Sequence, residues 1–198
     1  MPTLAFVVNR HNLNSVAALT GSLEADPRTA GLPLCFLWQD EGLATRLPDL
    51  VEEVDRLMVA VSFATATLPD SAGLLKWLCG LRPVPFVVAG GPHPSARAAE
   101  VLRLGADAVV IGEGEAALPD LLECIAAGES PEAMAGVAVL AEDGQLVQGP
   151  RRAPVELDAY PPLGVQHRRF GPIEITRGCP CACGFCQTSF LFGGRMRH

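Results

Sequence analysis

The sequence lacks both a membrane-spanning segment and a signal peptide. No apolar run approaches the ~20 residues that a membrane helix needs, and the N-terminus has no basic region before its five consecutive apolar residues, Leu4–Val8. This run predicts a first β-strand instead. The chain is 49% hydrophobic because Ala, Val and Leu recur in short segments, which suits a buried parallel sheet flanked by helices. We therefore expect a cytoplasmic protein with no membrane partner.

The formal charge of −7 is unevenly divided along the chain. Residues 1–150 hold eight Lys and Arg against 19 Asp and Glu, whereas residues 151–198 hold seven against three. The acidic body disfavours binding to nucleic acid. The basic tail has two equally good uses: it can bind an anionic ligand, or it can pair with the acidic body.

Five short apolar runs alternate with helical patterns over residues 1–130. The predicted strands are Leu4–Val8, Leu34–Leu37, Leu57–Ser62, Pro85–Ala89 and Ala108–Ile111. The predicted helices run from Asn12 or Asn14 through Leu23, over Pro48–Arg56, from Pro69 through Leu81, over Pro94–Leu104 and over Ala116–Ala127. Pro48 is placed first in its helix, where a proline sacrifices no hydrogen bond. The alternation predicts an α/β fold with a doubly wound, parallel, five-stranded sheet of flavodoxin or Rossmann type.

The rest of the chain divides into three further parts. Residues 131–150 are predicted to form a β-hairpin extension at the sheet edge, because Val137–Leu140 and Gln145–Val147 flank Asp143-Gly144. Residues 151–171 form a proline-containing linker, since prolines bias their predecessors away from helix. Residues 172–198 form a last part that opens with a predicted strand at Ile173–Thr176.

Seven cysteines without a secretion signal argue against a disulfide framework. Cys35, Cys79 and Cys124 each lie alone in an apolar segment, and we expect them to be small core residues. The other four crowd into eight residues and are Cys179, Cys181, Cys183 and Cys186.

Three thiolates on one tight loop can each reach a different iron of a cubane cluster, and the fourth iron then stays open to a small ligand. Gly178 and Gly184 would let the loop curl around such a cluster. A zinc site formed by all four cysteines is the alternative. Zinc usually takes its thiolates from two separate Cys-x-x-Cys knuckles, and the present spacings suit a tetrahedron poorly.

The spacing Cys179-x-x-x-Cys183-x-x-Cys186, after a predicted strand and with Phe185 before the last cysteine, resembles the radical S-adenosylmethionine superfamily. The resemblance implies that these three cysteines bind a 4Fe–4S cluster, that S-adenosylmethionine chelates the open iron, and that Phe185 contacts its adenine. It also implies reductive cleavage of S-adenosylmethionine to a 5′-deoxyadenosyl radical, with a reductant protein such as a ferredoxin or flavodoxin. Cys181 is additional to the family pattern and would be a spectator thiol.

A second ligand site is expected at the carboxyl ends of the five predicted strands, because doubly wound folds bind their ligands just beyond these ends. There Ser62 offers a small hydroxyl, and Gly90 and Gly91 leave room for close approach of a large flat ligand. Glu113 and Glu115 lie at a predicted helix start and would repel a phosphate. A nucleotide-binding flavodoxin-like domain is the alternative reading of these features.

Three stretches at this edge resemble the cobalamin-binding domain that precedes many radical S-adenosylmethionine barrels: Val61-Ser-Phe-Ala-Thr-Ala, Val88-Ala-Gly-Gly-Pro-His-Pro and Leu104–Glu115. The resemblance implies that Ser62, Gly90 and Gly91 line the pocket for the nucleotide tail of cobalamin. Many such domains carry Asp-x-His-x-x-Gly after the first strand, with the His on cobalt. Here only His11 of that motif remains. It lacks the Asp that would orient its ring, so we expect a solvated loop His.

The resemblance also implies a (β/α) barrel, which needs on the order of 200 residues, whereas only 12 residues follow Cys186. We therefore expect the first strand and cluster loop of an incomplete barrel, in a fragment or in a chain completed by a partner, and no activity of this chain alone. The predicted function is the N-terminal part of a cobalamin-dependent radical S-adenosylmethionine enzyme, for methyl transfer or another radical modification of an unidentified substrate. The alternative is a non-catalytic cobalamin or iron–sulfur module for electron transfer. No catalytic side chain is predicted.

Overall fold

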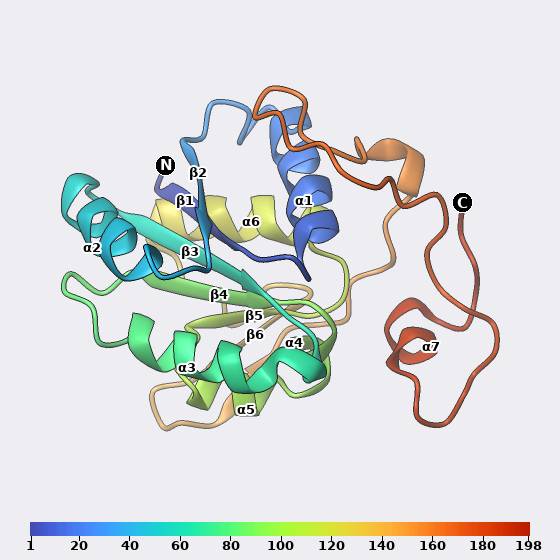
Figure 1. The fold of residues 1–198 in the computed structure, drawn as a ribbon. Coiled ribbons are helices and arrows are strands. Elements are labelled where there is room, and N and C mark those ends of the chain that lie inside the picture. Colours follow the sequence, from blue (N-terminus) through green and yellow to red (C-terminus); the bar gives the residue numbers. More distant parts are fainter.

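The computed structural model describes residues 1–198 and has an α/β architecture built on a seven-stranded sheet (Figure 1). The strands are β1 Thr3–Val8, β2 Leu34–Trp38, β3 Leu57–Ser62, β4 Phe86–Gly90, β5 Ala108–Val110, β6 Val137–Leu140 and β7 Leu146–Gln148. The helices are α1 Leu13–Ala25, α2 Leu43–Glu53, α3 Leu68–Leu78, α4 Pro92–Ala96, α5 Ala98–Arg103, α6 Gly114–Ala127 and α7 Gln187–Phe192, with short 3-10 turns at Thr65–Thr67 and Leu157–Ala159.

The strand order is β2-β1-β3-β4-β5-β6-β7. Strands β1 to β5 all pair in parallel, as the alternation of strands and helices predicts. Strands β6 and β7 continue the sheet in antiparallel fashion and form its edge, in the segment where the hairpin extension is predicted. The order of the first five strands is that of flavodoxin-like folds, in which the direction of winding reverses between β1 and β3.

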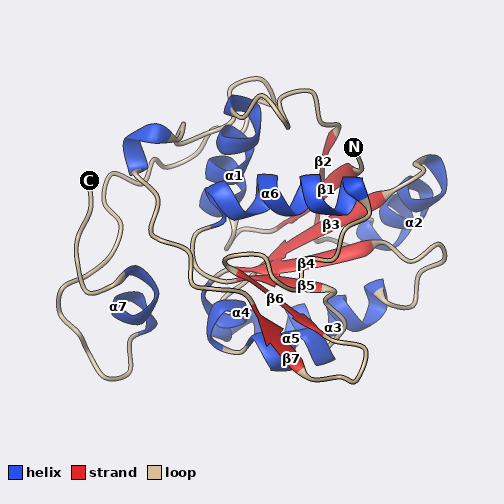
Figure 2. Ribbon diagram, turned by 180° about the vertical axis from the view of Figure 1, so that it is seen from behind, coloured by secondary structure: helices blue, strands red, loops and turns tan.

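Two hydrophobic cores cover the two faces of the sheet, and β1 contributes alternate residues to each. Leu4, Phe6 and Val8 pack with the buried side chains of α1 and α6. Ala5 and Val7 pack with those of α2, α3 and α5. Figures 1 and 2 show the two layers of helices on opposite sides of the strands. The doubly wound arrangement therefore follows from strands that are apolar on both faces.

Helix α2 begins at Leu43 rather than at Pro48, so the prediction for this helix start is wrong. Leu43, Leu47 and Val51 recur every four residues and are all buried against the sheet. This stripe extends the helix toward its N-terminus although Pro48 inside it cannot donate a hydrogen bond. Burial of the apolar stripe outweighs the preference of proline for the first turn.

The single helix predicted over Pro94–Leu104 is two helices, α4 and α5, separated at Arg97. Arg97 leaves the helical region with φ −130° and ψ 41°. Each short helix is held by different contacts. The Ser95 hydroxyl in α4 accepts a hydrogen bond from the Gly112 amide at 3.0 Å, whereas Val101 and Leu102 of α5 are buried in the core. These contacts hold α4 and α5 in different orientations, and the helix is interrupted at Arg97 between them.

The strand predicted at Ile173–Thr176 does not form. No strand lies beside this segment to pair with it, and the nearest ladder contact is one antiparallel bridge between Arg177 and Arg197. The last part of the chain instead consists of a long loop and α7, and it stands to one side of the sheet in Figure 1. Ile175 is largely exposed there.

The linker is fastened along α1 and β2. The Glu24 carboxylate of α1 accepts hydrogen bonds from the amides of Gln166 and His167 at 3.0 and 2.9 Å. The Arg169 guanidinium lies 3.9 Å from the centre of the Phe36 ring, in a cation–π contact. The linker thus leads the chain back over α1 to the carboxyl ends of the strands.

Among the helices there is none with both the length and the apolar character that crossing a membrane demands.

Candidate cofactor cleft and cysteine loop

A cleft of about 350 Å³ opens at the carboxyl ends of β1, β3, β4 and β5. Its walls come from α1, from the loops after these strands and from the start of α6, and half of its lining residues are hydrophobic. It lies at the point between β1 and β3 where the winding of the sheet reverses, which is where open α/β sheets bind ligands. The last part of the chain contributes Glu174, Arg177 and Phe192 to the lining.

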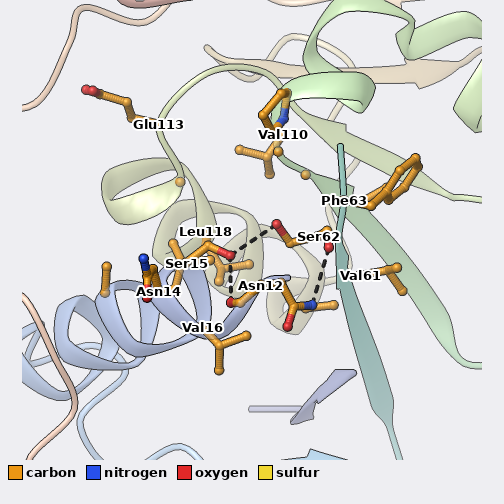
Figure 3. Close-up of a pocket in the computed structure, with 18 of the residues that line it drawn as sticks. Asn12, Asn14, Ser15, Val16, Val61, Ser62, Phe63, Val110, Glu113 and Leu118 are labelled. Carbon is orange, nitrogen blue, oxygen red and sulfur yellow. Dashed lines mark hydrogen bonds between the residues drawn. The ribbon is translucent and has the colours of Figure 1, made fainter. Parts of the chain in front are cut away.

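Polar side chains of α1 and β3 meet at one side of the cleft (Figure 3). The buried Asn12 amide group donates to the carbonyl oxygens of Val7 at 2.9 Å and Ser62 at 3.3 Å. Its oxygen accepts from the Asn9 amide at 2.9 Å. The Ser15 hydroxyl lies 3.3 Å from the Ser62 hydroxyl. These bonds tie the ends of β1 and β3 to the first turn of α1 and place two hydroxyls at the cleft.

The two glycines predicted for the site both line the cleft, but they serve different purposes. A Cβ atom on Gly90 would meet nothing within 4 Å, so the missing side chain leaves open space. Gly91 has φ +99°, and a Cβ there would lie 2.8 Å from the Phe63 carbonyl oxygen. Gly91 is therefore required by the turn between β4 and α4, whereas the missing side chain of Gly90 only leaves that part of the cleft open.

Five charged residues form an acid–arginine cluster at the rim of the cleft, and they are Glu113, Glu115, Glu174, Arg177 and Arg197. The Glu113 and Glu115 side chains are only 6% and 7% exposed. Burial alone would raise the pKa of Glu113. Its hydrogen bonds from Arg197 and the Val155 amide, with the nearby charge of Arg177, outweigh burial and lower that pKa below its usual value. Glu113 is therefore an anion at neutral pH.

Arg177 is likewise fixed as a cation. Burial would lower the pKa of its guanidinium, but the hydrogen bonds that it donates to Glu115 and Glu174 outweigh burial and raise that pKa. Of the two uses left open for the basic tail, the structure contains pairing with the acidic body. Arg152 provides a further example through its contact with Asp120 at 2.5 Å.

The two histidines near the cleft have different environments. His11 lines the cleft but is exposed, and its Nε2 accepts a hydrogen bond from the Arg10 side chain at 3.1 Å. His93 is buried in α4, with its ring stacked on Phe63 and its Nδ1 3.0 Å from the Thr65 hydroxyl. The Nε2 atom of His93 is buried without a hydrogen-bond partner. Neither ring has the carboxylate partner that orients metal-binding histidines.

The four clustered cysteines lie on the cysteine loop, defined as residues 178–196, which includes α7. Cys181 and Cys183 are exposed, and Cys179 and Cys186 are half-buried. The thiols are not gathered into a metal-binding group. The donor set of three thiolates on one loop still has the chemistry that iron–sulfur clusters require. The assignment of Cys179, Cys183 and Cys186 as ligands stays a prediction, as does the role of Phe185, which is 94% exposed.

Two of these thiols have shifted acidities. Cys186 precedes α7, and hydrogen bonds from the Thr188 side chain and amide lower its thiol pKa. The hydrogen bond with the neighbouring Cys179 raises the pKa of Cys181. The two shifts thus have opposite directions, and the hydrogen bonds at Cys186 favour the thiolate form of that residue.

Sequence reasoning missed Asn12, Ser15 and the acid–arginine cluster. The uneven division of charge between residues 1–150 and 151–198 pointed toward pairing of the two parts, and Glu113 and Glu115 were expected at this edge, but neither signal identified Arg177 and Arg197 as their partners. Nothing in the sequence distinguishes Ser15 from any other helical serine, because its role depends on the distance to Ser62 after folding.

Residues 36–122 match the family model of the B12 binding domain. The match extends from β2 to α6 and includes Ser62, Gly90, Gly91, Glu113 and Glu115. More than half of the residues that line the cleft lie within this matched segment.

Two curated relatives are methyltransferases by name. An uncharacterized methyltransferase of Pyrococcus horikoshii is 28% identical over 164 residues, which are 75% of this chain and 35% of the relative. The hopanoid C-3 methylase of Methylococcus capsulatus is 30% identical over 142 residues, which are 67% of this chain and 28% of the relative. The chain thus spans about a third or less of the length of these two relatives.

Two solved structures share the fold. The cobalamin-dependent S-adenosylmethionine radical enzyme OxsB with aqua-cobalamin bound has a TM-score of 0.67 at 18% identity, over 94% of this chain and 28% of that chain. The radical S-adenosylmethionine methyltransferase TsrM from Kitasatospora setae, with cobalamin and a [4Fe-4S] cluster bound, has a TM-score of 0.65 at 19% identity, over 100% of this chain and 45% of that chain.

Proposed function

We propose that this chain binds cobalamin in the cleft at the carboxyl ends of the strands, as part of a cobalamin-dependent radical S-adenosylmethionine methyltransferase. The observation that carries the proposal is the coincidence of the cleft with the B12-binding domain match. Ser62 and the open space at Gly90 fit a large flat ligand that approaches the backbone closely. The names of the relatives support methyl transfer as the reaction.

Three cysteines of the cysteine loop would hold a 4Fe–4S cluster, and the exposed position of the loop leaves room for S-adenosylmethionine. Bound to this protein, the cluster would pass one electron from a reductant protein to S-adenosylmethionine, and cobalamin would supply the transfer of a methyl group. The role of this chain is to bind and orient them. Ser62 and Gly90 shape the cobalamin site, and Cys179, Cys183 and Cys186 offer thiolates.

The cobalamin site can be tested with Gly90→Leu. The side chain should enter the open space of the cleft without strain, because no atom lies within 4 Å of the added Cβ. We expect cobalamin titration, followed by absorbance, to show at least a tenfold loss of affinity, about the effect of losing 1.4 kcal/mol of binding. Gly73→Leu is the matched control, since Gly73 on α3 has equally open surroundings outside the cleft.

Wild-type protein that binds no cobalamin would refute the proposal. Unchanged affinity of Gly90→Leu would refute the site.

The cluster can be tested by anaerobic reconstitution of single Cys→Ala variants with iron and sulfide. Variants of Cys179, Cys183 and Cys186 should each lose most of the iron, because a cubane needs all three thiolates. Cys181→Ala is the control and should retain it. Equal loss in all four variants, or zinc as the native metal, would contradict the assignment.

A second candidate function is a cobalamin-binding module without radical chemistry. The match to the B12 binding domain supports cobalamin binding by itself and says nothing of radical chemistry. Such a module would bind cobalamin in the first experiment and fail to assemble a cluster in the second.

A further inference from the structure

We propose that Arg177 is a positioning residue, which holds the cysteine loop at the rim of the cofactor cleft by binding Glu113 and Glu115. The purpose of this contact rests on the proposed function, since it would set the placement of a cluster relative to cobalamin. The contact itself involves only side chains of this chain and can be measured without either cofactor.

The geometry of Arg177 makes it a three-way connector. One guanidinium nitrogen, Nη2, contacts Glu115 at 2.7 Å and Glu174 at 2.7 Å, and the other, Nη1, contacts Glu113 at 3.2 Å. The side chain is only 11% exposed. A planar guanidinium can bond several carboxylates at once in fixed directions, which a lysine ammonium cannot do in the same way. Arg177 therefore fixes the orientation of the backbone that leads into Gly178 and Cys179.

The far end of the cysteine loop is held at the same place. Arg197 binds Glu113 through its guanidinium, with one contact at 3.2 Å. Its backbone amide and carbonyl pair with those of Arg177, at 2.9 Å in both directions. The two ends of the cysteine loop thus pair with each other, at Arg177 and Arg197. Both of these residues also bind the start of α6.

Gly178 allows this closure. Its φ is +98°, and a Cβ atom would lie 2.0 Å from the Arg195 carbonyl oxygen, so only glycine fits between Arg177 and Cys179. From the sequence, Gly178 was expected to let the loop curl around an iron–sulfur cluster. In the structure, Gly178 also lets the two ends of the loop approach each other.

The acid–arginine cluster joins two parts of the chain that lie far apart in the sequence. Glu113 and Glu115 belong to the segment that matches the B12-binding domain, whereas Arg177 and Arg197 flank the cysteine loop. Buried ion pairs contribute little net stability, because desolvation offsets their attraction, but removal of one partner is costly and a matched set favours one arrangement over others. A positioning role fits this balance better than a stabilising one.

The position of the acid–arginine cluster at the cleft also fits a positioning role. Glu113, Glu115, Glu174 and Arg177 all line the cleft as well as holding the loop. One side chain, Arg177, is thus two residues from a predicted cluster ligand and also in the wall of the predicted cobalamin site. A shift of the loop would move both together.

The first test measures hydrogen exchange in the 198-residue chain without cofactors. In Arg177→Gln, amides of residues 178–196 should exchange roughly ten- to a hundredfold faster, while β1 to β5 keep their protection. Glu115→Gln should have a smaller effect in the same residues. It should have no further effect in the Arg177→Gln background, because the partner is already absent. Arg177→Lys should restore protection only in part.

Arg195→Gln is the matched control, since Arg195 belongs to the same loop, is exposed and makes no ion pair. It should exchange as the wild type does. The proposal is overturned if Arg177→Gln behaves like Arg195→Gln, if the effects of Glu115→Gln and Arg177→Gln simply add, or if the whole sheet loses protection equally.

The second test addresses position after both cofactors are loaded. Electron paramagnetic resonance of the reduced cluster with cob(II)alamin should show a magnetic interaction between them in the wild type. Arg177→Gln should retain both cofactors and lose or alter that interaction, which a merely stabilising residue would leave unchanged. If the wild type loads neither cofactor, the proposed function fails while the exchange result still decides whether Arg177 positions the loop. An unaltered interaction in Arg177→Gln would overturn the positioning role.

Discussion

The hydroxyl oxygens of Ser15 and Ser62 lie 3.3 Å apart, where the first turn of α1 meets the end of β3. Ser15 also donates a hydrogen bond to the Asn12 carbonyl oxygen at 2.9 Å. With that hydrogen committed, the contact between the two serines uses the hydrogen of Ser62. An acceptor atom of a ligand in the cleft would therefore compete with Ser15 for the Ser62 hydroxyl.

This relationship separates the two serines in a binding experiment. Ser62→Ala should weaken cobalamin binding about three- to tenfold, the usual effect of one lost hydrogen bond. Ser15→Ala should leave the affinity unchanged or slightly higher, because it removes the competitor. Absorbance titration of both variants against wild type measures the difference. A larger loss in Ser15→Ala would mean that Ser15, and not Ser62, contacts the ligand.

Asn12 is expected to contribute to stability and not to ligand binding directly. It is 4% exposed and satisfies two carbonyl oxygens and one amide across β1, β3 and α1. Asn12→Ala should lower the free energy of unfolding by about 1–3 kcal/mol, because it leaves buried backbone groups without partners. Asn12→Asp should lower it further at neutral pH, since a carboxylate would face the carbonyl oxygens of Val7 and Ser62.

Urea denaturation of these two variants measures the change. Asn14→Ala is the control, because Asn14 is exposed and makes no side-chain hydrogen bond. If Asn12→Asp were as stable as the wild type, the amide group would not be the donor that the hydrogen-bond pattern requires.

Gly91 and Gly112 provide a matched pair for the cost of a side chain at positive φ. Gly91→Ala should lower the free energy of unfolding by about 3 kcal/mol, because strain at φ +99° adds to a Cβ contact of 2.8 Å with the Phe63 carbonyl oxygen. Gly112→Ala at φ +85° should cost only about 1 kcal/mol, since nothing lies within 4 Å of its Cβ. Thermal or urea denaturation distinguishes them. Equal losses would mean that the turn after β4 adjusts to relieve the contact.

Most of the parallel sheet could be predicted from sequence because each strand is a short apolar run, and β1, β3, β4 and β5 are mostly buried, whereas the edge strand β2 is only half-buried. Leu57–Ser62 is predicted and observed with the same bounds. Local rules failed where a tertiary contact overrides them. Proline at 48 favours a helix start, yet the buried stripe through Leu43 and Leu47 extends α2 beyond it. The composition of residues 94–104 favours one helix, yet anchors on both sides of Arg97 divide it.

The candidate site was predictable in part for the same reason. The carboxyl ends of parallel strands share one edge, so Ser62 and Gly90 could be placed at the same edge from the prediction of a parallel sheet, and the structure pairs them on β3 and β4. The pairing of Arg177 with Glu115 joins residues 62 positions apart and depends on how the linker returns the chain over α1. No periodicity encodes that return. Ile173–Thr176 has the composition of a strand, but composition cannot supply the neighbour with which a strand must pair.

The attachment of the linker to α1 should weaken in acid, because it depends on the Glu24 carboxylate. Burial alone would raise the pKa of Glu24. Hydrogen bonds from the amide and ring of His167 and from the Gln166 amide outweigh burial, and the pKa lies below its usual value. A carboxyl group with a lower pKa in the folded state stabilises that state above its unfolded pKa of about 4.3, and the contribution disappears as the pH falls through the lower folded value.

The free energy of unfolding of Glu24→Gln should therefore be lower than that of the wild type at neutral pH, and the two should converge as the pH falls below about 4. Urea denaturation at several pH values measures the difference. Glu52→Gln, at an exposed position without an ion pair, is the control and should follow the wild type throughout. A difference between Glu24→Gln and wild type that does not change with pH would mean that the carboxylate charge is not what holds the linker. The shape of the Glu24 side chain, and not its charge, would then explain how it holds the linker.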